Sequence, residues 1–249
     1  MAESRERQAL AHLFIQPIKE VYNEGNWHYV VSSLATGGTL EEWISERRKE
    51  DRPMNEQQLM SLFAMILLGM EETHAQGQLH RNVSSAHVYL DKDSQIARLG
   101  SHANTTFKEW WEKCYNKVFK GEWYYLSPLA SEGKKYAQED DIWALGVLFA
   151  ELATLQQKPK DEKPLFTAEQ VTAGEHLNMV SHFSSEVHDL FEALLQVDEA
   201  KRPTIHDILQ FPAVTSEVNK LLCSTEFNEK FDTIMLHKLN CEKERTTEV

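Results

Sequence analysis

The sequence has 249 residues, of which 41% are apolar and 10% aromatic, so the chain is long enough to bury a substantial core. Its 39 acidic residues against 26 basic ones give a net charge of −13, which repels nucleic acid and anionic membrane surfaces. We therefore expect neither nucleic acid nor a membrane among its partners.

The cysteines and the first residues bear on the compartment. Cys114, Cys223 and Cys241 are widely spaced, with no C-x-x-C pair and no histidine at metal-ligand spacing, which is typical of free thiols in a reducing compartment. The charged start lacks the apolar core of a signal peptide, and the apolar runs are too short to span a bilayer. We expect a cytoplasmic protein with no metal site and no cofactor.

The first elements expected are a helix and a β-hairpin. Good helix formers and apolar residues at helical spacing predict a short amphipathic helix over residues 2–14. Two β-rich runs, at 15–22 and 27–34, flank a turn at 23–26, which predicts an antiparallel hairpin. After a break that contains two glycines, Thr39 is expected to cap a helix.

A second helix and a second hairpin come next. Apolar residues at three- and four-residue steps predict a helix with one buried face over residues 55–76, ended by Gly77. Two short β-rich runs around a charged turn predict a hairpin over residues 88–99, followed by a long connection from 101 to 131.

The rest of the chain is expected to be mostly helical. Residues 141–155 are almost wholly apolar, and a helix that is apolar on all sides belongs in the centre of a domain. Further helices are expected at 167–173, 186–196 and 205–211, and the stretch 216–249 is expected to hold one docked helix and a frayed end.

Several short motifs occur in a fixed order. Residues 79–88 read LHRNVSSAHV, the outline of a protein-kinase catalytic loop, H-R-D-L-x-x-x-N. Three more follow: YYLSP at 124–128, DIWALG at 141–146 and KRPT at 201–204. The set resembles a protein kinase from its αC helix to its carboxyl end, most like the NIMA-related (Nek) kinases, over nearly the whole chain.

The resemblance implies an α+β, protein-kinase-like fold with two lobes. The small lobe would be truncated to the αC helix and a short β-hairpin, and the large lobe would be mostly α-helical. We divide the chain into a small lobe at 1–34, a large lobe at 35–214 and a C-terminal helix and tail at 215–249. No residue of the sequence can be assigned to the family's glycine-rich phosphate loop or to the lysine of its third strand.

The positions that carry chemistry in the family differ here. Asn82 replaces the catalytic base, Ser84 the catalytic-loop lysine, His87 the second metal ligand, and Ser101 the D-F-G aspartate. A serine hydroxyl is a poor ligand for a hard dication that prefers carboxylate oxygens. A positioned base alone is worth roughly 10²- to 10⁴-fold in rate, so the resemblance predicts a degenerate site.

Other family positions are retained, and the resemblance gives them scaffold roles. These are His80, Arg81, Asp141, Trp143, Gly146 and Arg202, with Asp141 bracing the backbone of the catalytic loop. The glutamate that pairs with the family's arginine is Leu129 here, so Arg202 needs another acceptor, and Asp198 and Glu199 are the candidates. Glu122 replaces a threonine and either holds Arg81 as a phosphate mimic or is a solvated acid, the interpretation we favour.

An aromatic cluster marks the segment that would be a mobile activation loop. Trp110, Trp111 and Tyr115 form either an interface, where aromatic residues are enriched, or simply part of the packing of their own lobe.

The function expected is that of an inactive Nek-like pseudokinase, a scaffold or allosteric regulator that binds a kinase, a kinase substrate or a cytoskeletal complex, without ATP. One alternative is an active serine/threonine kinase with unconventional catalytic residues, and another is a nucleotide-binding sensor without turnover. The first hairpin would have an open edge, so either an oligomer or a partner covers it, or the sequence is part of a longer protein.

Overall fold

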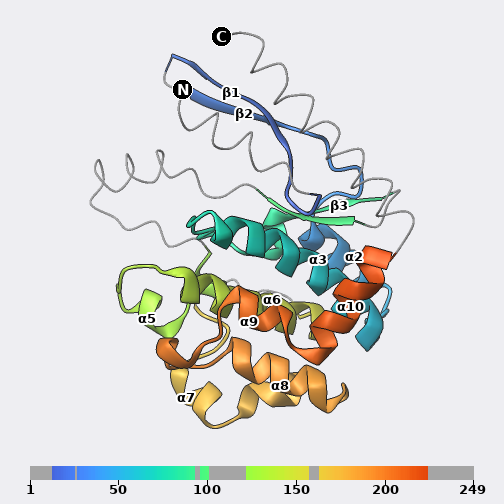
Figure 1. Cartoon of the computed structure of the whole chain (residues 1–249), viewed down its shortest axis with the longest axis vertical. Helices are drawn as coiled ribbons and strands as arrows, with labels where there is room; N and C mark the ends of the chain where they lie inside the picture. Colours follow the sequence, from blue (N-terminus) through green and yellow to red (C-terminus); the bar gives the residue numbers. More distant parts are fainter. Residues whose placement is uncertain (1–12, 26, 93–95, 101–121, 157–162, 224–249) are drawn as a thin grey trace.

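The computed structural model describes residues 13–25, 27–92, 96–100, 122–156 and 163–223. Within them, a two-stranded β-hairpin projects from a mainly helical body, and a second, shorter hairpin lies on that body (Figure 1). The mixed α+β character agrees with the kinase-like architecture expected from the sequence.

The projecting hairpin consists of β1 (Ile18–Glu24) and β2 (Trp27–Ser32), which pair antiparallel. Gly25 follows β1 with a φ of +57°, in the left-handed region that glycine enters without strain. The predicted hairpin is confirmed, although Asn23 and Glu24 belong to β1 rather than to the turn. The helix expected at 2–14 lies almost entirely outside the described residues.

Two capped helices follow the hairpin. α2 (Leu40–Lys49) begins as expected at Thr39, whose side chain accepts a hydrogen bond from the backbone N–H of Glu42 while the Glu42 side chain accepts one from Thr39. α3 (Glu56–Ala75) has the same reciprocal cap between Asn55 and Gln58. After α3 the chain turns at Gly77, which has a φ of +68°.

The second hairpin connects the body to the chain that enters β1. η1 (Ser85–His87) leads into β3 (Val88–Asp91), which pairs antiparallel with β4 (Ile96–Leu99), and β4 lies against α3. The backbone of Leu99 donates to Phe14 and accepts from Gln16, both at 2.8 Å. These two hydrogen bonds fix the start of the projecting hairpin on the body.

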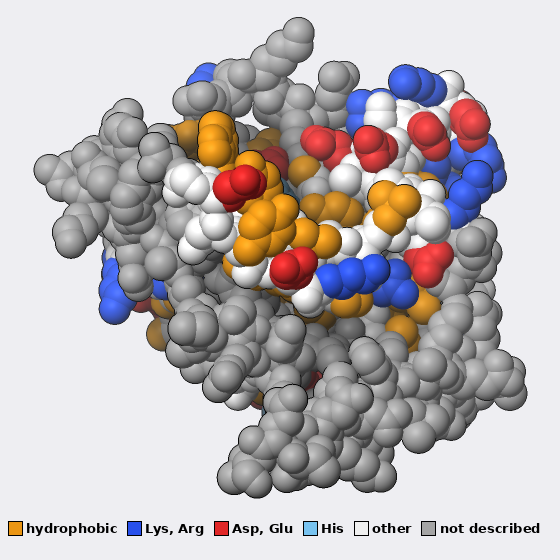
Figure 2. Space-filling model, turned by 90° about the horizontal axis from the view of Figure 1, so that it is seen from above, with side chains coloured by type: hydrophobic (Ala, Val, Ile, Leu, Met, Phe, Trp, Pro, Cys, Tyr) orange, Lys and Arg blue, Asp and Glu red, His pale blue; other side chains and the backbone are white. Residues whose placement is uncertain are grey.

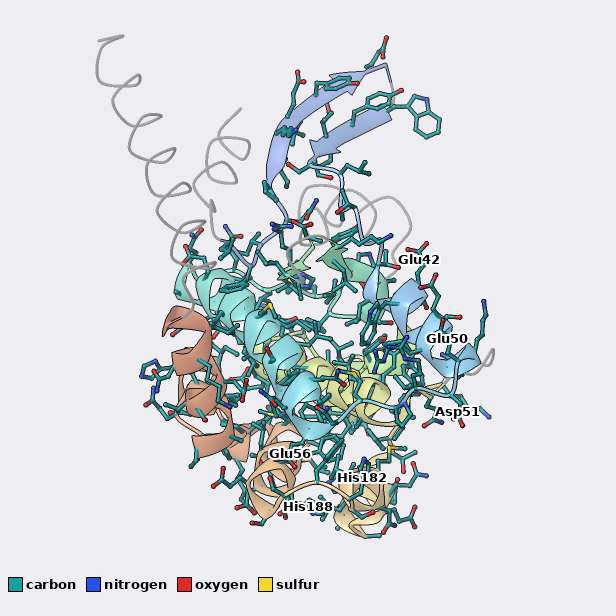
Figure 3. The ribbon with its side chains drawn as sticks, turned by 90° about the vertical axis from the view of Figure 1, so that its right-hand side faces the viewer. Glu42, Glu50, Asp51, Glu56, His182 and His188 are labelled. Atoms are coloured by element: carbon teal, nitrogen blue, oxygen red, sulfur yellow. The ribbon has the colours of Figure 1, made fainter. Side chains whose placement is uncertain are left out.

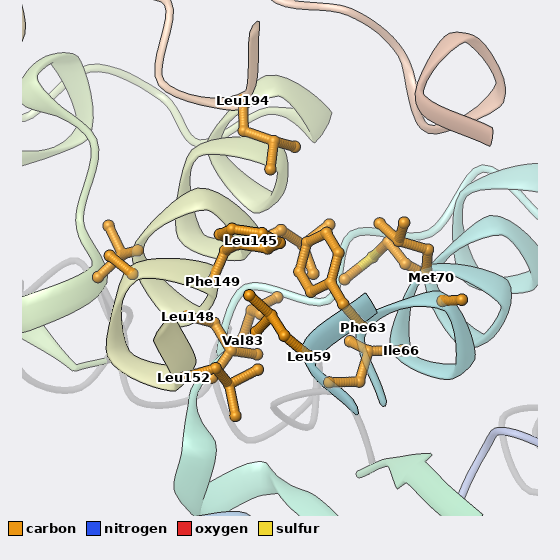
Figure 4. Packing of buried hydrophobic residues seen from close by; sticks show 14 of the residues in the cluster. Leu59, Phe63, Ile66, Met70, Val83, Leu145, Leu148, Phe149, Leu152 and Leu194 are labelled. Carbon is orange, nitrogen blue, oxygen red and sulfur yellow. The ribbon is translucent and has the colours of Figure 1, made fainter. Parts of the chain in front are cut away.

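The centre of the body is α6 (Gln138–Thr154), whose residues from 140 to 153 are all buried. The Phe149 ring on α6 meets that of Phe63 on α3 edge-to-face, with centroids 4.9 Å apart, inside a continuous apolar cluster (Figure 4). The predicted central helix is therefore confirmed. Shorter elements surround it: η2 (Trp123–Tyr125), α5 (Pro128–Ser131), α7 (Ala168–Thr172), η3 (Glu175–Val180), α8 (Ser185–Leu194), η4 (Glu199–Lys201) and α9 (Ile205–Leu209).

The last described helix is α10 (Pro212–Cys223), which packs against α3, α8 and α9. It starts four residues before the stretch in which a docked helix was expected, and it crosses position 214. The starts of α3 and α8 are joined by the Glu56 carboxylate, which accepts from both the backbone N–H and the hydroxyl of Ser184 at 2.7 Å (Figure 3). Within the described ranges, no helix combines the length and the apolar character that crossing a bilayer requires.

Candidate functional site

The backbone of the loop at residues 79–88 is held by one buried carboxylate. Asp141, at the start of α6, accepts hydrogen bonds at 2.8 Å from the backbone N–H groups of both His80 and Arg81. The His74 ring on α3 lies 2.9 Å from the same carboxylate, and the Tyr136 hydroxyl donates to it at 2.9 Å. Asp141 thus joins two helices and the loop at a single point.

These partners decide the ionisation of Asp141. Burial alone would raise the pKa of its carboxyl, but the hydrogen bonds from His74 and from the loop backbone outweigh burial and hold the pKa below its ordinary value. Burial, together with the neighbouring negative charge of Asp141, raises the pKa of the Tyr136 hydroxyl well above its ordinary value. Asp141 is therefore the anion of this cluster and Tyr136 a neutral donor.

The same brace holds an unusual backbone conformation. Arg81 has a φ of +66°, in a region that a residue with a side chain rarely enters and that costs of order 1–3 kcal/mol. The hydrogen bond from its N–H to Asp141 fixes this conformation. The Arg81 side chain is half-buried, and in the part of the chain that the structure describes its Nε atom has no hydrogen-bond partner.

His80 is fully buried beneath the loop. Its Nδ1 accepts from the backbone N–H of Asn82 at 3.3 Å, so its Nε2 carries the proton and donates to the carbonyl of Gly100 at 3.2 Å. Burial lowers the pKa of His80 to about 4, against the opposing attraction of Asp141. The ring is consequently a neutral structural link between the loop and the end of β4.

The substituted positions of the loop are hydrogen-bonded to one another. The Asn82 amide Nδ2 lies 3.1 Å from His87 Nε2, and His87 Nδ1 lies 2.8 Å from the Ser84 hydroxyl. Ser84 in turn donates to the Glu122 carboxylate at 2.9 Å. Because a carboxylate only accepts, the directions follow: Asn82 donates to His87, His87 to Ser84, and Ser84 to Glu122.

The hydrogen bond between Ser84 and Glu122 contradicts both expectations for Glu122. The side chain is half-buried and binds the Ser84 hydroxyl, with His87 Nδ1 3.9 Å away, so it is neither a solvated acid nor a clamp for Arg81. Sequence reasoning missed the contact because residues 84 and 122 lie far apart along the chain. The paired loss of a lysine at 84 and a threonine at 122 was the one signal available.

The arrangement leaves little acid–base chemistry at position 82. The amide of Asn82 cannot accept a proton as a carboxylate does, and its nitrogen is engaged with His87. Its Oδ1 is buried and has no hydrogen-bond partner among the described residues. The His87 imidazole is engaged on both sides, with Nε2 facing the Asn82 amide and Nδ1 facing the Ser84 hydroxyl.

A second network lies behind the loop and was not anticipated. The backbone N–H of Ser85 donates to the Tyr125 hydroxyl at 3.1 Å, and the Ser85 hydroxyl donates to Glu151 at 3.0 Å. Tyr125 also donates to the Glu151 carboxylate, and burial with this negative neighbour raises the pKa of the tyrosine well above its ordinary value. The network ties the loop, η2 and α6 together.

Arg202 finds acceptors, but not the two carboxylates expected. Its guanidinium donates to three backbone carbonyls, those of Glu139 at 2.6 Å, Gln196 at 2.9 Å and Val197 at 3.4 Å. It also lies over the Trp143 ring, 5.2 Å from the centroid. The Asp198 side chain instead caps η4. Carbonyls satisfy this cation without the cost of burying a second charge.

A pocket of about 300 Å³ lies where the projecting hairpin joins the body, with Leu34, Thr39 and Tyr89 among its lining residues. Gln16, which also lines it, is buried, and its amide nitrogen donates to the carbonyl of Ser33. Within the described ranges, the Gln16 Oε1 atom has no hydrogen-bond partner.

Other predicted site residues fall outside this geometry. Ser101 and the aromatic cluster Trp110, Trp111 and Tyr115 lie outside the described residues. Gly146 packs on α6 directly against Leu195. Across the described ranges, no group of three or more His, Cys, Asp or Glu side chains is placed to hold a metal ion.

The family model described as "Protein kinase domain" matches residues 1–214. The chain belongs to the protein kinase family. Among its kinase relatives are human "Serine/threonine-protein kinase Nek5", 27% identical over 219 residues, and zebrafish "Serine/threonine-protein kinase Nek8", 29% identical over 200 residues. Human "Serine/threonine-protein kinase Nek2" is 26% identical over 202 residues. The Nek-like assignment made from the motifs is confirmed.

The alignments cover most of this kinase-like chain but a small part of its relatives. The alignment with human Nek5 covers 86% of the chain and 30% of that relative. The alignment with zebrafish Nek8 covers 80% of the chain and 28% of the relative, and the alignment with human Nek2 covers 76% of the chain and 43% of the relative. The chain thus spans less than half the length of these relatives.

Proposed function

We propose that this chain is a catalytically inactive Nek-like pseudokinase that acts as a protein-binding scaffold or allosteric regulator. The observation that carries the proposal is the series of hydrogen bonds Asn82–His87–Ser84–Glu122. In that order, these residues occupy the positions of the family's base, second metal ligand, catalytic-loop lysine and substrate-contacting threonine. The side chains at these four positions are hydrogen-bonded to one another, which supports a role other than phosphotransfer.

Magnitudes favour inactivity over weak activity. A positioned general base is worth roughly 10²- to 10⁴-fold in rate, and an amide at position 82 offers no such base. The retained brace at Asp141 supports a role that depends on the shape of the lobe. Candidate partners are an active kinase, a kinase substrate or a cytoskeletal complex.

The rival is an active serine/threonine kinase, which is what the names of the relatives say of those proteins. The test incubates the purified chain with labelled ATP, magnesium or manganese and generic protein substrates, beside an Asn82→Ala variant. We expect no transfer from either protein. Transfer by the unaltered chain that Asn82→Ala abolishes would establish the rival and end the proposal.

One observation favours a second candidate, a nucleotide-binding sensor without turnover. The pocket at the hairpin junction, about 300 Å³, is at the lower end of the range for small-molecule sites. A ligand that binds only the folded chain raises its melting temperature by mass action. We expect ATP to cause no shift, and a shift that saturates with ATP concentration would favour the sensor.

A further inference from the structure

The projecting hairpin has one face whose composition is unusual for a solvent-exposed sheet. The register pairs Glu20 with Val31, Tyr22 with Tyr29, and Glu24 with Trp27. Directly opposed residues share a face, as do alternate residues along a strand. We define the hairpin face by these six side chains: Glu20, Tyr22, Glu24, Trp27, Tyr29 and Val31.

The aromatic members of the hairpin face are open to solvent. Trp27 is 72% exposed, Tyr22 42% and Tyr29 39%. The two tyrosine rings stack with centroids 4.9 Å apart and an angle of 13° between their planes. Figure 2 shows hydrophobic side chains gathered on this part of the surface with acidic ones at their edges, and Figure 3 shows the hairpin side chains standing clear of the body.

The two carboxylates border the rings on both sides. Glu20 and Glu24 are exposed and lie two residues before and after Tyr22, and Glu24 is directly opposite Trp27. Over the described part of the chain, neither glutamate forms a salt bridge. The cation–π contacts found there lie on the body, at Trp43 and Trp143, so the ring faces of the hairpin are not covered by a cation of the described chain.

We propose that the hairpin face binds a segment of a protein partner that presents Arg or Lys side chains. A cation over an exposed ring is attracted by the ring quadrupole, to an extent equivalent to about 2- to 5-fold in affinity, and a carboxylate beside the ring adds charge complementarity. The inference rests on the proposed function, since it gives the binding module a surface and its partner a chemistry.

Charge decides against other occupants. A second copy of the same face would bring two further glutamates against Glu20 and Glu24, and like charges in contact are unfavourable. Nucleic acid and anionic membrane surfaces are repelled by the same carboxylates and by the net charge of −13. A cationic segment is the occupant for which both the rings and the carboxylates are favourable.

The test measures fluorescence anisotropy of a labelled peptide of alternating Arg and Gly, beside the same peptide with neutral citrulline in place of Arg. We expect the full chain to bind the Arg peptide and to bind the citrulline peptide more weakly. Trp27→Ala should weaken Arg-peptide binding about 2- to 5-fold, the equivalent of one exposed cation–π contact. Because Trp27 is exposed, the Trp27→Ala variant should have the same melting temperature as the unaltered chain.

The matched control removes the same charge elsewhere. The double variant Glu20→Gln with Glu24→Gln should weaken binding of the Arg peptide. The control double variant, Glu186→Gln with Glu192→Gln, should not weaken it. Both control residues are exposed on α8, at the far end of the body. Equal losses from both pairs, no binding at all, or a dimer that Trp27→Ala dissociates would each overturn the inference. Phosphate transfer is measured independently, so its outcome separates failure of this surface from failure of the pseudokinase proposal.

Discussion

Asp141 is the residue on which the loop depends, because one side chain satisfies two backbone donors and two side chains. Asp141→Asn replaces an acceptor oxygen by an NH₂ group that faces donors. We expect the free energy of unfolding to fall by about 3 kcal/mol. Urea titration measures this loss, and Asp189→Asn on the exposed side of α8 should cost about 0.5 kcal/mol or less. Equal costs for the two variants would contradict the role given to Asp141.

His80 gives the protein a predictable response to acid. Its pKa is lowered to about 4 in the folded chain against 6.5 for the unfolded one, so the unfolded state binds the proton first as pH falls. The stability that His80 contributes is complete above the unfolded pKa and declines between these two values. From His80 alone, the free energy of unfolding should be about 2 kcal/mol smaller near pH 5 than near pH 7.

Urea titrations at the two pH values check this response. His80→Gln should remove that part of the pH dependence, because glutamine does not titrate. His182→Gln, at an exposed histidine, should leave it unchanged (Figure 3). The assignment to His80 would fail if both variants kept the full pH dependence.

At the scale of elements, a single substitution can probe the contact between α6 and the end of α8. A Cβ added at Gly146 would lie 2.8 Å from Leu195 Cδ2 and 3.1 Å from Leu194 Cβ. Gly146→Ala should therefore lower the free energy of unfolding by about 1–3 kcal/mol.

A double-mutant cycle identifies the cause of that loss. In a Leu195→Ala background the clash with the leucine side chain is gone, so the cost of Gly146→Ala should shrink by about 1 kcal/mol. Additive costs in the cycle would show that crowding against Leu195 is not the cause.

The elements that the sequence predicts well are those specified locally. Thr39 and Asn55 are cap residues whose partners lie three positions ahead, and the apolar run of α6 needs no knowledge of its neighbours. The start of α10 at Pro212 was not predicted from the sequence. A proline marks the first turn of a helix only when the preceding helix is known to have ended, and the end of α9 at Leu209 was not predicted.

The candidate site was predictable in identity but not in geometry. The resemblance gave the positions of Asn82, Ser84 and His87, whereas the contact of Ser84 with Glu122 joins residues that no local pattern connects. The exposed hairpin face was not predicted from the sequence, for a related reason. Alternation along β1 and β2 shows which side chains share a face, but not which face the rest of the chain covers.

At the scale of the whole molecule, the projecting hairpin and the body should differ in stability. The strands of the hairpin lie mainly against each other and carry exposed side chains, whereas α6 is buried along its length. Amide hydrogen exchange should show β1 and β2 exchanging through local opening, and α6 only through global unfolding.

Gly146→Ala separates the two kinds of opening. It should lower the protection of α6 by the full loss in global stability and leave the β1–β2 amides unchanged. Parallel losses of protection in both regions would show that the hairpin and the body unfold as one unit.

The mutual hydrogen bonding of residues 82, 84, 87 and 122 also bears on what the family's own side chains would meet at these positions. An aspartate restored at position 82 would set a carboxylate oxygen against the lone pair of His87 Nε2, 3.1 Å away, unless the imidazole took up a proton. A lysine restored at 84 would leave His87 without the hydroxyl that accepts from it. Each of the family's side chains would lose or oppose a hydrogen bond that is present here, so a single substitution toward the family's sequence should be unfavourable unless its neighbours change with it.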